Sequence, residues 1–402
     1  MTSEWNHFAL GEITELVIDY RGKTPKKLGG DWCKQGYRAL SAKNIKTGRI
    51  VQAETIRYID ESLYRKWMKD EVQRGDILIT SEAPFGQIFF WDSDEKIVLS
   101  QRLFCVRIKP EYDARFIYYY MTTPEFQSEL DGRATGTTVI GLRQPELMKC
   151  IIRCPEIQEQ KVIAAILSSI DAKIIANEKV NDNLEQQAQA IYHERFETIS
   201  PNDLPSEWRI VTLGEVATIS NKSFNPLKEP EILLEHYSIP AFDEARFPVF
   251  ELSTSIKSNK FIIDASCFMI SKLNPTTKRV WKPYCLTGNA VCSTEFIVYK
   301  AKDKTITDFL YSVIDSNSFS DFMCSHVTGS TGSRQRTTPS DTLSYELTLP
   351  SEDELAEFQS LVSPMYAQIR INAIENDRLK RLRDSLLPKL MSGEIDVSTI
   401  QL

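Results

Sequence analysis

Two long heptad repeats match each other position by position, and they constrain the fold more than any other feature of the sequence. In each repeat, the residues of one seam recur at alternating steps of four and three, which is the a/d pattern of a coiled coil. A long helix with a single apolar seam must bury that seam against a partner, so the sequence predicts a helical pair within a duplicated chain. The seam residues are Ile163, Leu167, Ile170, Ile174, Asn177, Asn181, Leu184 and Ile191 in the first repeat and Phe358, Val362, Met365, Ile369, Asn372, Asn376, Leu379 and Leu386 in the second.

Two asparagines interrupt each seam at matching positions, Asn177 and Asn181 in the first and Asn372 and Asn376 in the second. A buried Asn lowers the stability of a coiled coil but fixes its register and its choice of partner. We expect antiparallel helices, because that arrangement separates two bulky domains without a clash, and the four asparagines could then meet near the middle. Two alternatives stay open: the residues lie at the surface of a partly hydrated seam, or they face another protein.

The duplication extends beyond the helices. Each half opens with a Trp followed by Leu-Gly-Glu, at Trp5 and Trp208, and continues through strands, two helices and a Gly/Thr/Ser-rich segment to a long helix. We therefore expect an α+β fold, in which two globular α+β domains are separated by a long antiparallel two-helix coiled coil, as a pseudo-twofold internal repeat. The expected boundaries are 1–157 for the first domain, 158–197 for the central helix, 198–207 for a linker, 208–353 for the second domain, 354–391 for the C-terminal helix and 392–402 for a tail over the surface.

The composition is typical of a globular cytoplasmic protein. The chain has 402 residues, enough for two or three domains, and no apolar run approaches the roughly 20 residues that span a bilayer. The first residues lack the basic and apolar regions of a signal peptide. The eight cysteines are scattered without a CxxC pair, so we interpret them as reduced thiols and expect no metal site.

The net charge of −7 by itself argues against nucleic-acid binding, but the basic residues are clustered. Lysine and arginine outnumber acidic residues between positions 19 and 49 and again between positions 257 and 304. Phosphates respond to such local clusters, because salt screens charge beyond about 10 Å. One cluster alone is typical of a solvated face, whereas two clusters at corresponding places of a duplicated chain favour DNA.

No catalytic motif repeats with the duplication. The sequence has no Walker A loop, no NPPY-like tetrapeptide of an amino-methyltransferase, no Gly-rich loop of a βαβ unit and no HExxH. The four histidines do not correspond between the two halves. The pattern indicates binding rather than catalysis; a nuclease fused to recognition domains and a coiled-coil protein-interaction adaptor are the alternatives.

Several motifs resemble the specificity (S) subunit of type I restriction–modification systems, and the resemblance spans essentially the whole chain. The motifs are the W-x-x-x-x-LGE opening, present twice, RGKTPKK at 21–27, GDILITSEAPFG at 75–86, CPEIQEQKVIAAIL at 154–167 and RLRDSLLPKLMSGEI at 381–395. The second half lacks the G-x-TP loop, and its counterpart of the GDIL strand is reduced to SCFMIS at 266–271. Such divergence is expected of this family, because its two recognition domains read different sequences.

The resemblance implies a subunit without activity of its own in a DNA-methylation and phage-defence complex. Each globular domain would be a target-recognition domain that reads one half of a bipartite double-stranded DNA site. The helices would set the spacing and dock two adenine-N6 methyltransferase subunits. S-adenosylmethionine, ATP and magnesium would be used by those subunits and by motor-nuclease subunits, with no cofactor and no metal in this chain. A DNA-recognition subunit of another defence complex is an alternative.

We expect loops of each domain to enter the major groove while basic residues hold phosphates. Arg and Lys can read guanine, and Asn and Gln can read adenine, so polar and basic side chains in loops are the candidates. The expected DNA-binding residues are Lys23, Lys43, Asn44, Ser81, Gln101, Arg102 and Arg133 in the first domain and Lys222, Lys272, Asn274, Lys278, Arg279, Arg334, Gln335 and Arg336 in the second. No catalytic residue is expected.

Overall fold

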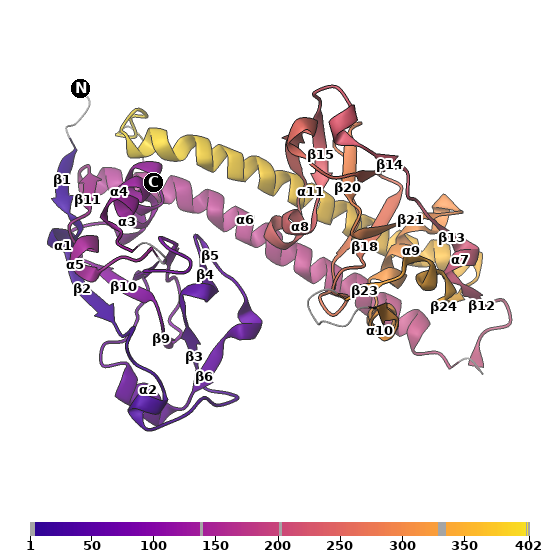
Figure 1. Cartoon of the computed structure of the whole chain (residues 1–402), viewed down its shortest axis with the longest axis horizontal. Coiled ribbons are helices and arrows are strands. Elements are labelled where there is room, and N and C mark those ends of the chain that lie inside the picture. Colours follow the sequence, from indigo (N-terminus) through magenta and orange to yellow (C-terminus); the bar gives the residue numbers. More distant parts are fainter. Residues whose placement is uncertain (1–4, 137–139, 201–202, 329–334, 399, 401–402) are drawn as a thin grey trace. The chain divides into compact units, whose positions relative to one another are not determined.

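The computed structural model describes residues 5–136, 140–200, 203–328, 335–398 and 400 (Figure 1). The chain forms two compact units: unit 1 is Met1–Ala172 with Leu379–Leu402, and unit 2 is Lys173–Arg378. The expected division treats the long helices as segments of their own, whereas each unit contains part of both helices. The reason is that the ends of the apolar seam continue into the cores of the globular regions.

Unit 1 contains a four-stranded antiparallel sheet with the order β2-β10-β7-β8 and a three-stranded sheet with the order β6-β3-β9. The first sheet consists of Thr14–Asp19 (β2), Leu103–Ile108 (β10), Ile77–Thr80 (β7) and Ile88–Phe90 (β8). The second consists of Arg57–Ile59 (β6), Tyr37–Leu40 (β3) and Ile97–Leu99 (β9), with β3 parallel to β9. Two antiparallel pairs complete the strands, Asn6–Ala9 (β1) with Ile151–Cys154 (β11) and Ile45–Lys46 (β4) with Arg49–Ile50 (β5).

Two helices of unit 1 illustrate how side chains cap free backbone amides. The Asp113 carboxylate accepts from the Phe116 amide, and the Thr123 hydroxyl accepts from the Phe126 amide ahead of a proline in the first turn. The α-helices are Leu10–Ile13 (α1), Glu61–Trp67 (α2), Ala114–Met121 (α3), Pro124–Arg133 (α4) and Gln144–Leu147 (α5), and the 3-10 helices are Lys26–Leu28 (η1), Ala42–Asn44 (η2) and Ala53–Thr55 (η3).

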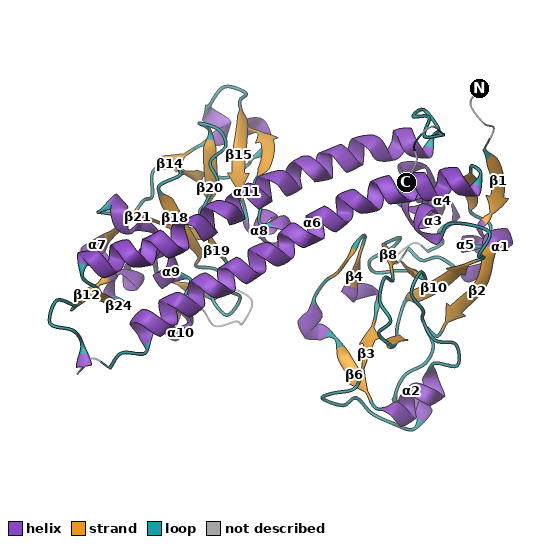
Figure 2. Cartoon of the chain, turned by 180° about the vertical axis from the view of Figure 1, so that it is seen from behind, coloured by secondary structure: helices purple, strands orange, loops and turns teal. Residues whose placement is uncertain are grey.

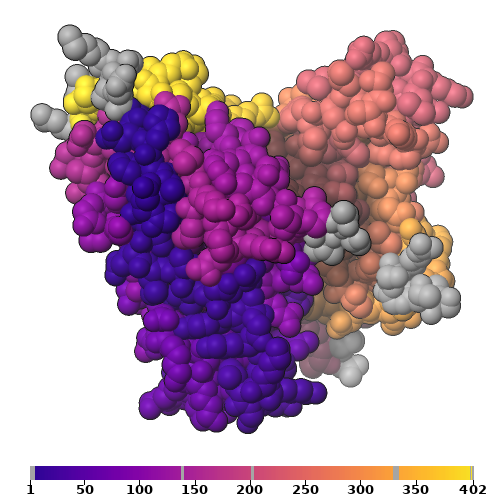
Figure 3. All heavy atoms as spheres, turned by 60° about the vertical axis from the view of Figure 1, so that its left-hand side comes forward, coloured from indigo at the N-terminus to yellow at the C-terminus, as the bar shows by residue number. Residues whose placement is uncertain are grey.

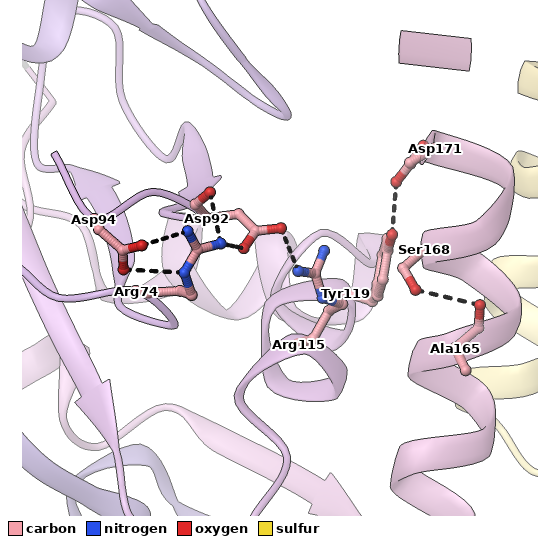
Figure 4. A network of polar contacts seen from close by, with 8 residues as sticks. All are labelled: Arg74, Asp92, Asp94, Arg115, Tyr119, Ala165, Ser168 and Asp171. Atoms are coloured by element: carbon pink, nitrogen blue, oxygen red, sulfur yellow. Dashed lines mark hydrogen bonds and ion pairs between the residues drawn. The ribbon is translucent and has the colours of Figure 1, made fainter. Parts of the chain in front are cut away.

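A polar network holds α3 in place within unit 1 (Figure 4). The Tyr119 hydroxyl donates to Asp171 of the long helix α6 (Ile157–Tyr192) at 2.6 Å. On the other side, Arg115 donates to Asp92 at 2.7 Å, and Asp92 also accepts from Arg74. The helix is therefore fixed both to the sheet region and to α6.

Most described residues of the C-terminal tail are exposed, and one residue anchors the tail to the core of unit 1. Val397 is fully buried in a cluster that also contains Trp5 and Met391. Gly393 has a φ of +76°, a conformation open to glycine, which lets the chain turn back beside the indole of Trp5. Figure 3 shows the yellow C-terminal end of helix α11 (Glu352–Met391) beside the indigo N-terminal segment. When Val397 packs against the core, it covers apolar side chains that would otherwise be exposed, and more apolar surface is removed from water than if Val397 lay at the surface.

Unit 2 repeats the central sheet of unit 1, with the order β13-β21-β18-β19. These strands are Ala217–Ile219 (β13), Phe296–Ala301 (β21), Cys267–Ser271 (β18) and Val280–Trp281 (β19). A five-stranded sheet has the order β14-β17-β20-β15-β16 and consists of Ser223–Phe224, Lys260–Ile262, Ala290–Ser293, Leu233–Tyr237 and Val249–Leu252. Two strand pairs complete the unit, Arg209–Thr212 (β12) with Glu346–Leu349 (β24) and Val327–Thr328 (β22) with Arg336–Thr337 (β23).

The remaining helices of unit 2 match those of unit 1 in part: in both units a short α-helix follows the first strand, and two α-helices follow the central sheet. The α-helices are Leu213–Val216 (α7), Ile239–Ala245 (α8), Thr307–Ile314 (α9) and Asn317–Ser325 (α10), and the 3-10 helices are Pro226–Lys228 (η6), Ser253–Ser255 (η7), Lys304–Ile306 (η8) and Pro339–Ser344 (η9). The pair β12–β24 occupies the place of β1–β11, since each joins the opening of a repeat to the strand before a long helix. The internal repeat predicted from the sequence is thus confirmed.

The two long helices, α6 and α11, are continuous (Figure 2), and α6 is followed by a π-helical turn, His193–Glu197. Their portions within unit 2 are antiparallel, because Asn177 contacts Asn376 whereas Arg195 contacts Glu357 further along. In unit 1, Asp171 pairs with Arg383 at 2.8 Å. The expected antiparallel pairing is confirmed. In the described part of the chain, no helix combines the length and the apolar character needed to cross a membrane.

The seam residues are buried or half-buried, as the heptad pattern predicts. Fully or nearly fully buried are Ile163, Leu167, Ile170, Ile174, Asn177, Phe358, Val362, Asn372 and Asn376. Half-buried are Asn181, Leu184, Ile191, Met365, Ile369, Leu379 and Leu386. Within unit 2 the asparagines form pairs across the helices: Asn177 Nδ2 donates to Asn376 Oδ1 at 2.9 Å, and Asn372 Nδ2 donates to Asn181 Oδ1 at 2.8 Å. The structure thus brings the four asparagines together, as the first of the three interpretations supposes.

We expect a single substitution in the Asn177–Asn376 pair to be more destabilising than replacement of both asparagines. Asn177→Leu should lower the stability of unit 2 by about 1–3 kcal/mol, because the buried Asn376 amide loses its partner. Asn177→Leu combined with Asn376→Leu should recover most of this loss, since two apolar side chains leave no unpaired polar group. A double-mutant cycle, in which hydrogen exchange of the helix amides gives the stability of each variant, measures the coupling energy between the two asparagines. If the stability changes of the two single variants add up to that of the double variant, the pair does not interact as proposed.

Candidate nucleic-acid interface

In unit 1, three segments that are distant in the sequence meet at the end of strand β7. The Ser81 amide donates to the Arg102 carbonyl at 2.9 Å, and the Ser81 carbonyl accepts from the Leu142 amide at 3.0 Å. The turn before β10 and the segment after α4 are therefore fixed to the end of β7. We call residues 81–82, 101–102 and 141–142 the first junction.

Unit 2 contains the same arrangement. The Lys272 amide donates to the Glu295 carbonyl at 2.9 Å, and the Lys272 carbonyl accepts from the Thr337 amide at 3.1 Å. These bonds make Lys272 the counterpart of Ser81 and Glu295 the counterpart of Arg102. We call residues 272–274, 294–295 and 335–337 the second junction.

Equivalent strands position the two junctions, although their sequences differ. Ile77–Thr80 (β7) and Cys267–Ser271 (β18) are each entirely buried, and each pairs on one side with the strand that follows the turn of its junction. The GDIL motif and its degraded counterpart SCFMIS therefore give the same strand. A buried strand requires apolar side chains on both faces but does not require particular ones. The polar residues just after each strand are left free to differ between the units.

A cavity of about 260 Å³ adjoins the first junction. It includes four of the predicted residues, Lys43, Asn44, Gln101 and Arg102. The sequence analysis missed two further lining residues, Trp32 and Arg57, whose guanidinium carbon lies 5.3 Å from the Trp32 ring centroid. The remaining lining residues are Ala39, Ser41, Ala42, Thr55, Ala83 and Ser100. Arg57 lies outside the basic run at 19–49, and only its cross-strand position on β6 brings it here, so no local sequence signal identifies it.

The side chain of Asn44 is committed to its own loop and does not face a ligand, so its assignment as a base-reading residue is wrong. Asn44 is 1% exposed. Its Oδ1 accepts from the amide and hydroxyl of Ser41, and its Nδ2 donates to the Gln52 carbonyl and the Thr55 hydroxyl. All these contacts satisfy the amide inside the loop. Asn44 therefore shapes the cavity without reading from it.

Two other predicted residues of unit 1 also have internal partners. The Lys23 ammonium donates to the Trp67 carbonyl and lies 3.6 Å from the centroid of the Tyr20 ring, and burial lowers the pKa of Lys23. Arg133 donates to Glu129 at 2.8 and 3.0 Å at the end of α4. Both side chains stabilise the unit, so neither is free to hold a phosphate in this arrangement. Ser81 is 1% exposed, and its hydroxyl has no hydrogen-bond partner among the described residues.

Arg102 combines exposure with an unusual backbone. Its φ is +64°, in the left-handed region that is unfavourable for a residue with a Cβ. Its Nε lies 3.0 Å from Glu82 Oε1, and its side chain is 48% exposed. The turn before β10 thus accepts a strained residue and places an open guanidinium at the cavity.

We expect Arg102→Gly to separate folding from recognition. Glycine adopts this φ without strain, so unit 1 should keep its stability or gain up to about 1 kcal/mol, while recognition by the first junction is lost. Gln101→Gly is the matched control, since the φ of Gln101 is not positive and glycine there should be destabilising by about 0.5–1 kcal/mol. Hydrogen exchange of the β10 amides measures the stability of both variants. A marked loss of stability in Arg102→Gly would contradict the role of strain.

In unit 2, two predicted residues form ion pairs within the unit. Arg279 donates to both carboxylate oxygens of Asp243 and is only 13% exposed. Lys278 contacts the carbonyl and the carboxylate of Asp315. These two assignments are not supported, because the Arg279 guanidinium is enclosed and the Lys278 ammonium is held by two oxygens of Asp315.

Four other predicted residues of unit 2 lie at the second junction. Lys272, Asn274, Gln335 and Arg336 belong to it, and the Asn274 amide donates to the Gln335 carbonyl at 2.9 Å. Asn274 has a φ of +48°, and its Oδ1 is buried without a partner among the described residues. Lys222 is exposed and directly precedes β14, an edge strand of the five-stranded sheet. Arg334 lies outside the described residues.

The basic clusters counted in the sequence contain less free charge than expected. In unit 1, Arg21 pairs with Asp19 and Arg38 with Glu95. In unit 2, Lys282 pairs with Asp308 and Lys300 with Asp264, and Lys260 is 6% exposed. Within the described residues, the Lys43, Lys222 and Lys272 side chains have no such partner. Positive charge is therefore available at separate points near the junctions, not over broad faces.

The residues do not fit a bound metal in the described part of the chain, where no three His, Cys, Asp or Glu side chains form a suitable group. All eight cysteines are free thiols. Burial raises the pKa of Cys150 and of Cys154 to about 12, so neither is a thiolate ready to bind a metal.

Comparisons with known proteins agree with these features. Residues 2–186 match the family described as the type I restriction modification DNA specificity domain. The MjaIX specificity subunit of a type I restriction enzyme from Methanocaldococcus jannaschii is 24% identical over 356 residues, which cover 81% of this chain and 79% of the relative. The HindI specificity subunit from Haemophilus influenzae is 21% identical over 422 residues, covering 81% of this chain and 88% of the relative.

A solved structure shares the fold. The S subunit of a type I restriction–modification system from M. genitalium superposes with a TM-score of 0.58 at 16% sequence identity, covering 96% of both chains. Residues 2–186 thus match the DNA specificity domain of type I restriction–modification systems, and the chain resembles their specificity subunits in sequence over 81% of its length and in fold.

Proposed function

We propose that this chain recognises a bipartite double-stranded DNA site, with each unit reading one half of it. The observation that carries the proposal is the pair of junctions, in which equivalent backbone bonds present different side chains. A shared backbone frame with different polar residues is suited to reading two different base sequences. In unit 1, Gln101 and Arg102 would read base edges while Lys43 and Arg57 hold phosphates. In unit 2, Lys272, Gln335 and Arg336 would take these roles.

We further propose that the helices α6 and α11 set the spacing of the site and dock two adenine-N6 methyltransferase subunits. The antiparallel seam and its asparagine pairs, which fix a single register, support a spacing role. Exposed apolar side chains on the helices, such as Ile175 and Ile371 of unit 2, support a docking role.

In this proposal the chain is not itself an enzyme. Its lack of a repeated catalytic set supports this, and S-adenosylmethionine, ATP and magnesium would be used by the methyltransferase and motor-nuclease subunits. Its work on chromosomal DNA would place it in the cytoplasm.

Sequencing of methylated adenines in cells with and without the gene tests the proposal. We expect a bipartite motif that disappears when the gene is deleted. Purified chain with its partner subunits should bind this motif with a steep salt dependence, as phosphate contacts require. Absence of any methylated motif, together with binding that does not depend on salt, would instead indicate a protein-interaction adaptor. DNA cleavage by the purified chain with magnesium alone would contradict the non-catalytic role.

A further inference from the structure

Each junction contains one arginine held by a glutamate. In the first, Arg102 Nε lies 3.0 Å from Glu82 Oε1. In the second, Arg336 Nε and Nη2 donate to the two carboxylate oxygens of Glu295 at 3.0 and 3.1 Å. The two arginine side chains are 48% and 43% exposed, so each guanidinium is held on one side and open on another.

The two pairs are built from different positions of the repeat. Arg102 lies in the turn before β10, and Glu82 follows β7. In unit 2 the equivalent turn position is Glu295, and the arginine comes from the segment at β23. The same charge pair is therefore built from different places in the repeat, so it is not a residue simply retained from the duplication. Its recurrence indicates a common requirement at the junction.

The pairs are poorly suited to stabilising the fold. Both glutamates are partly exposed, at 34% for Glu82 and 28% for Glu295, and ion pairs at such positions contribute little to stability. The Arg279–Asp243 pair differs, because its arginine is 13% exposed and its guanidinium is enclosed. A role in orienting the arginine for a ligand explains an exposed pair better than a role in folding.

The geometry suits the recognition of guanine. A guanidinium whose Nε side is held by a carboxylate still offers hydrogens on its Nη atoms, and these can bond the O6 and N7 acceptors of guanine together. Adenine presents an amino donor in place of O6 and would face the arginine with like polarity. Holding the side chain beforehand also reduces the conformational entropy that binding removes.

We propose that Glu82 and Glu295 are specificity-determining positioning residues, each of which orients an arginine to read one guanine in its half of the site. This inference rests on the proposed function. It adds the identity of the base and two acidic residues that no motif in the sequence singles out.

The test replaces each glutamate with glutamine in the full-length chain, expressed together with its modification subunits, and determines the methylated motif. Glu82→Gln should relax one G·C position in one half-site, and Glu295→Gln one G·C position in the other. Discrimination at these positions should fall about tenfold or more, while the other positions keep their preference. Glu82→Asp, which retains the charge, should restore part of the discrimination.

Glutamates that pair with arginine outside the junctions provide matched controls. Glu61→Gln removes the partner of Arg65 in unit 1, and Glu357→Gln removes the partner of Arg195 in unit 2. Both should leave the motif unchanged, because a general loss of an ion pair does not alter base reading.

The outcomes separate the inference from the function it rests on. If the unaltered gene directs no bipartite motif, the proposed function fails. If the motif exists but Glu82→Gln and Glu295→Gln leave it unchanged, or relax A·T positions or both half-sites together, the inference fails. If a variant abolishes methylation, binding of the purified complex to duplexes with each base pair changed in turn decides: a retained preference for guanine at every position overturns the inference.

Discussion

We expect Phe358→Ala to lower the stability of unit 2 by about 3–5 kcal/mol, the range for a large aromatic side chain removed from a core. Phe358 is fully buried. Its ring centroid lies 5.2 Å from that of Phe196 and 6.0 Å from that of Phe309, so it joins α11 to the π-helical turn after α6 and to α9. The aromatic cluster would keep a cavity, because the surrounding rings cannot close around alanine.

Hydrogen exchange of the β21 amides measures this effect within unit 2 of the full-length chain. Methylation of the bipartite site should be lost, since the second junction depends on the same sheet. Leu361→Ala is the control, because Leu361 lies on the same helix and is 40% exposed, and it should change little. Equal protection in the two variants would show that Phe358 is not part of the core that supports the junction.

The second large effect concerns unit 1, where Asp76→Ala should be destabilising by about 3–5 kcal/mol. Asp76 is 1% exposed and accepts from Arg107 Nε and Nη2 at 2.8 and 2.9 Å and from the Gln73 amide at 2.8 Å. Its removal leaves the Arg107 guanidinium, which is 18% exposed, without its carboxylate. A partly buried charge without its partner is much more costly than the loss of an exposed ion pair.

Exchange of the β7 and β10 amides would report this loss, because Asp76 precedes β7 and Arg107 lies on β10. Recognition of the half-site read by the first junction should weaken as well, since both strands end at that junction. Asp94→Ala is the control: Asp94 pairs with Arg74 at the surface of the same unit and is 82% exposed (Figure 4). It should leave protection unchanged. A similar loss of protection in both variants would contradict the importance of burial.

The heptad pattern predicted the helical pair well because its cause is local. A helix of 3.6 residues per turn places every third and fourth residue on one face, so the order of apolar residues is enough to locate the seam. The matching positions of the asparagines in the two seams could be predicted for the same reason, since they too follow from the order of residues along each helix. Their pairing across the helices, however, required the antiparallel register, which brings Asn177 to Asn376 and Asn181 to Asn372.

The candidate site was harder to predict, because a loop side chain looks the same in the sequence whether it is free or already paired. Arg279 and Arg336 are both basic residues near a strand end. Arg279 is enclosed by Asp243 of α8, whereas Arg336 is held by Glu295 and stays open. The sequence offers no sign of this difference, since both acids lie more than thirty residues away in the chain.

By itself the sequence determined the duplication, the two long helices with their polar interruptions and the resemblance to specificity subunits, since each rests on residue order within a short stretch. Only the tertiary structure decided which polar side chains remain available, that Val397 of the C-terminal tail joins the core that contains Trp5, and that two junctions recur at equivalent strand ends. The physical reason is that hydrogen bonds and ion pairs depend on atoms a few ångströms apart. Those atoms come from segments whose proximity the chain acquires only on folding.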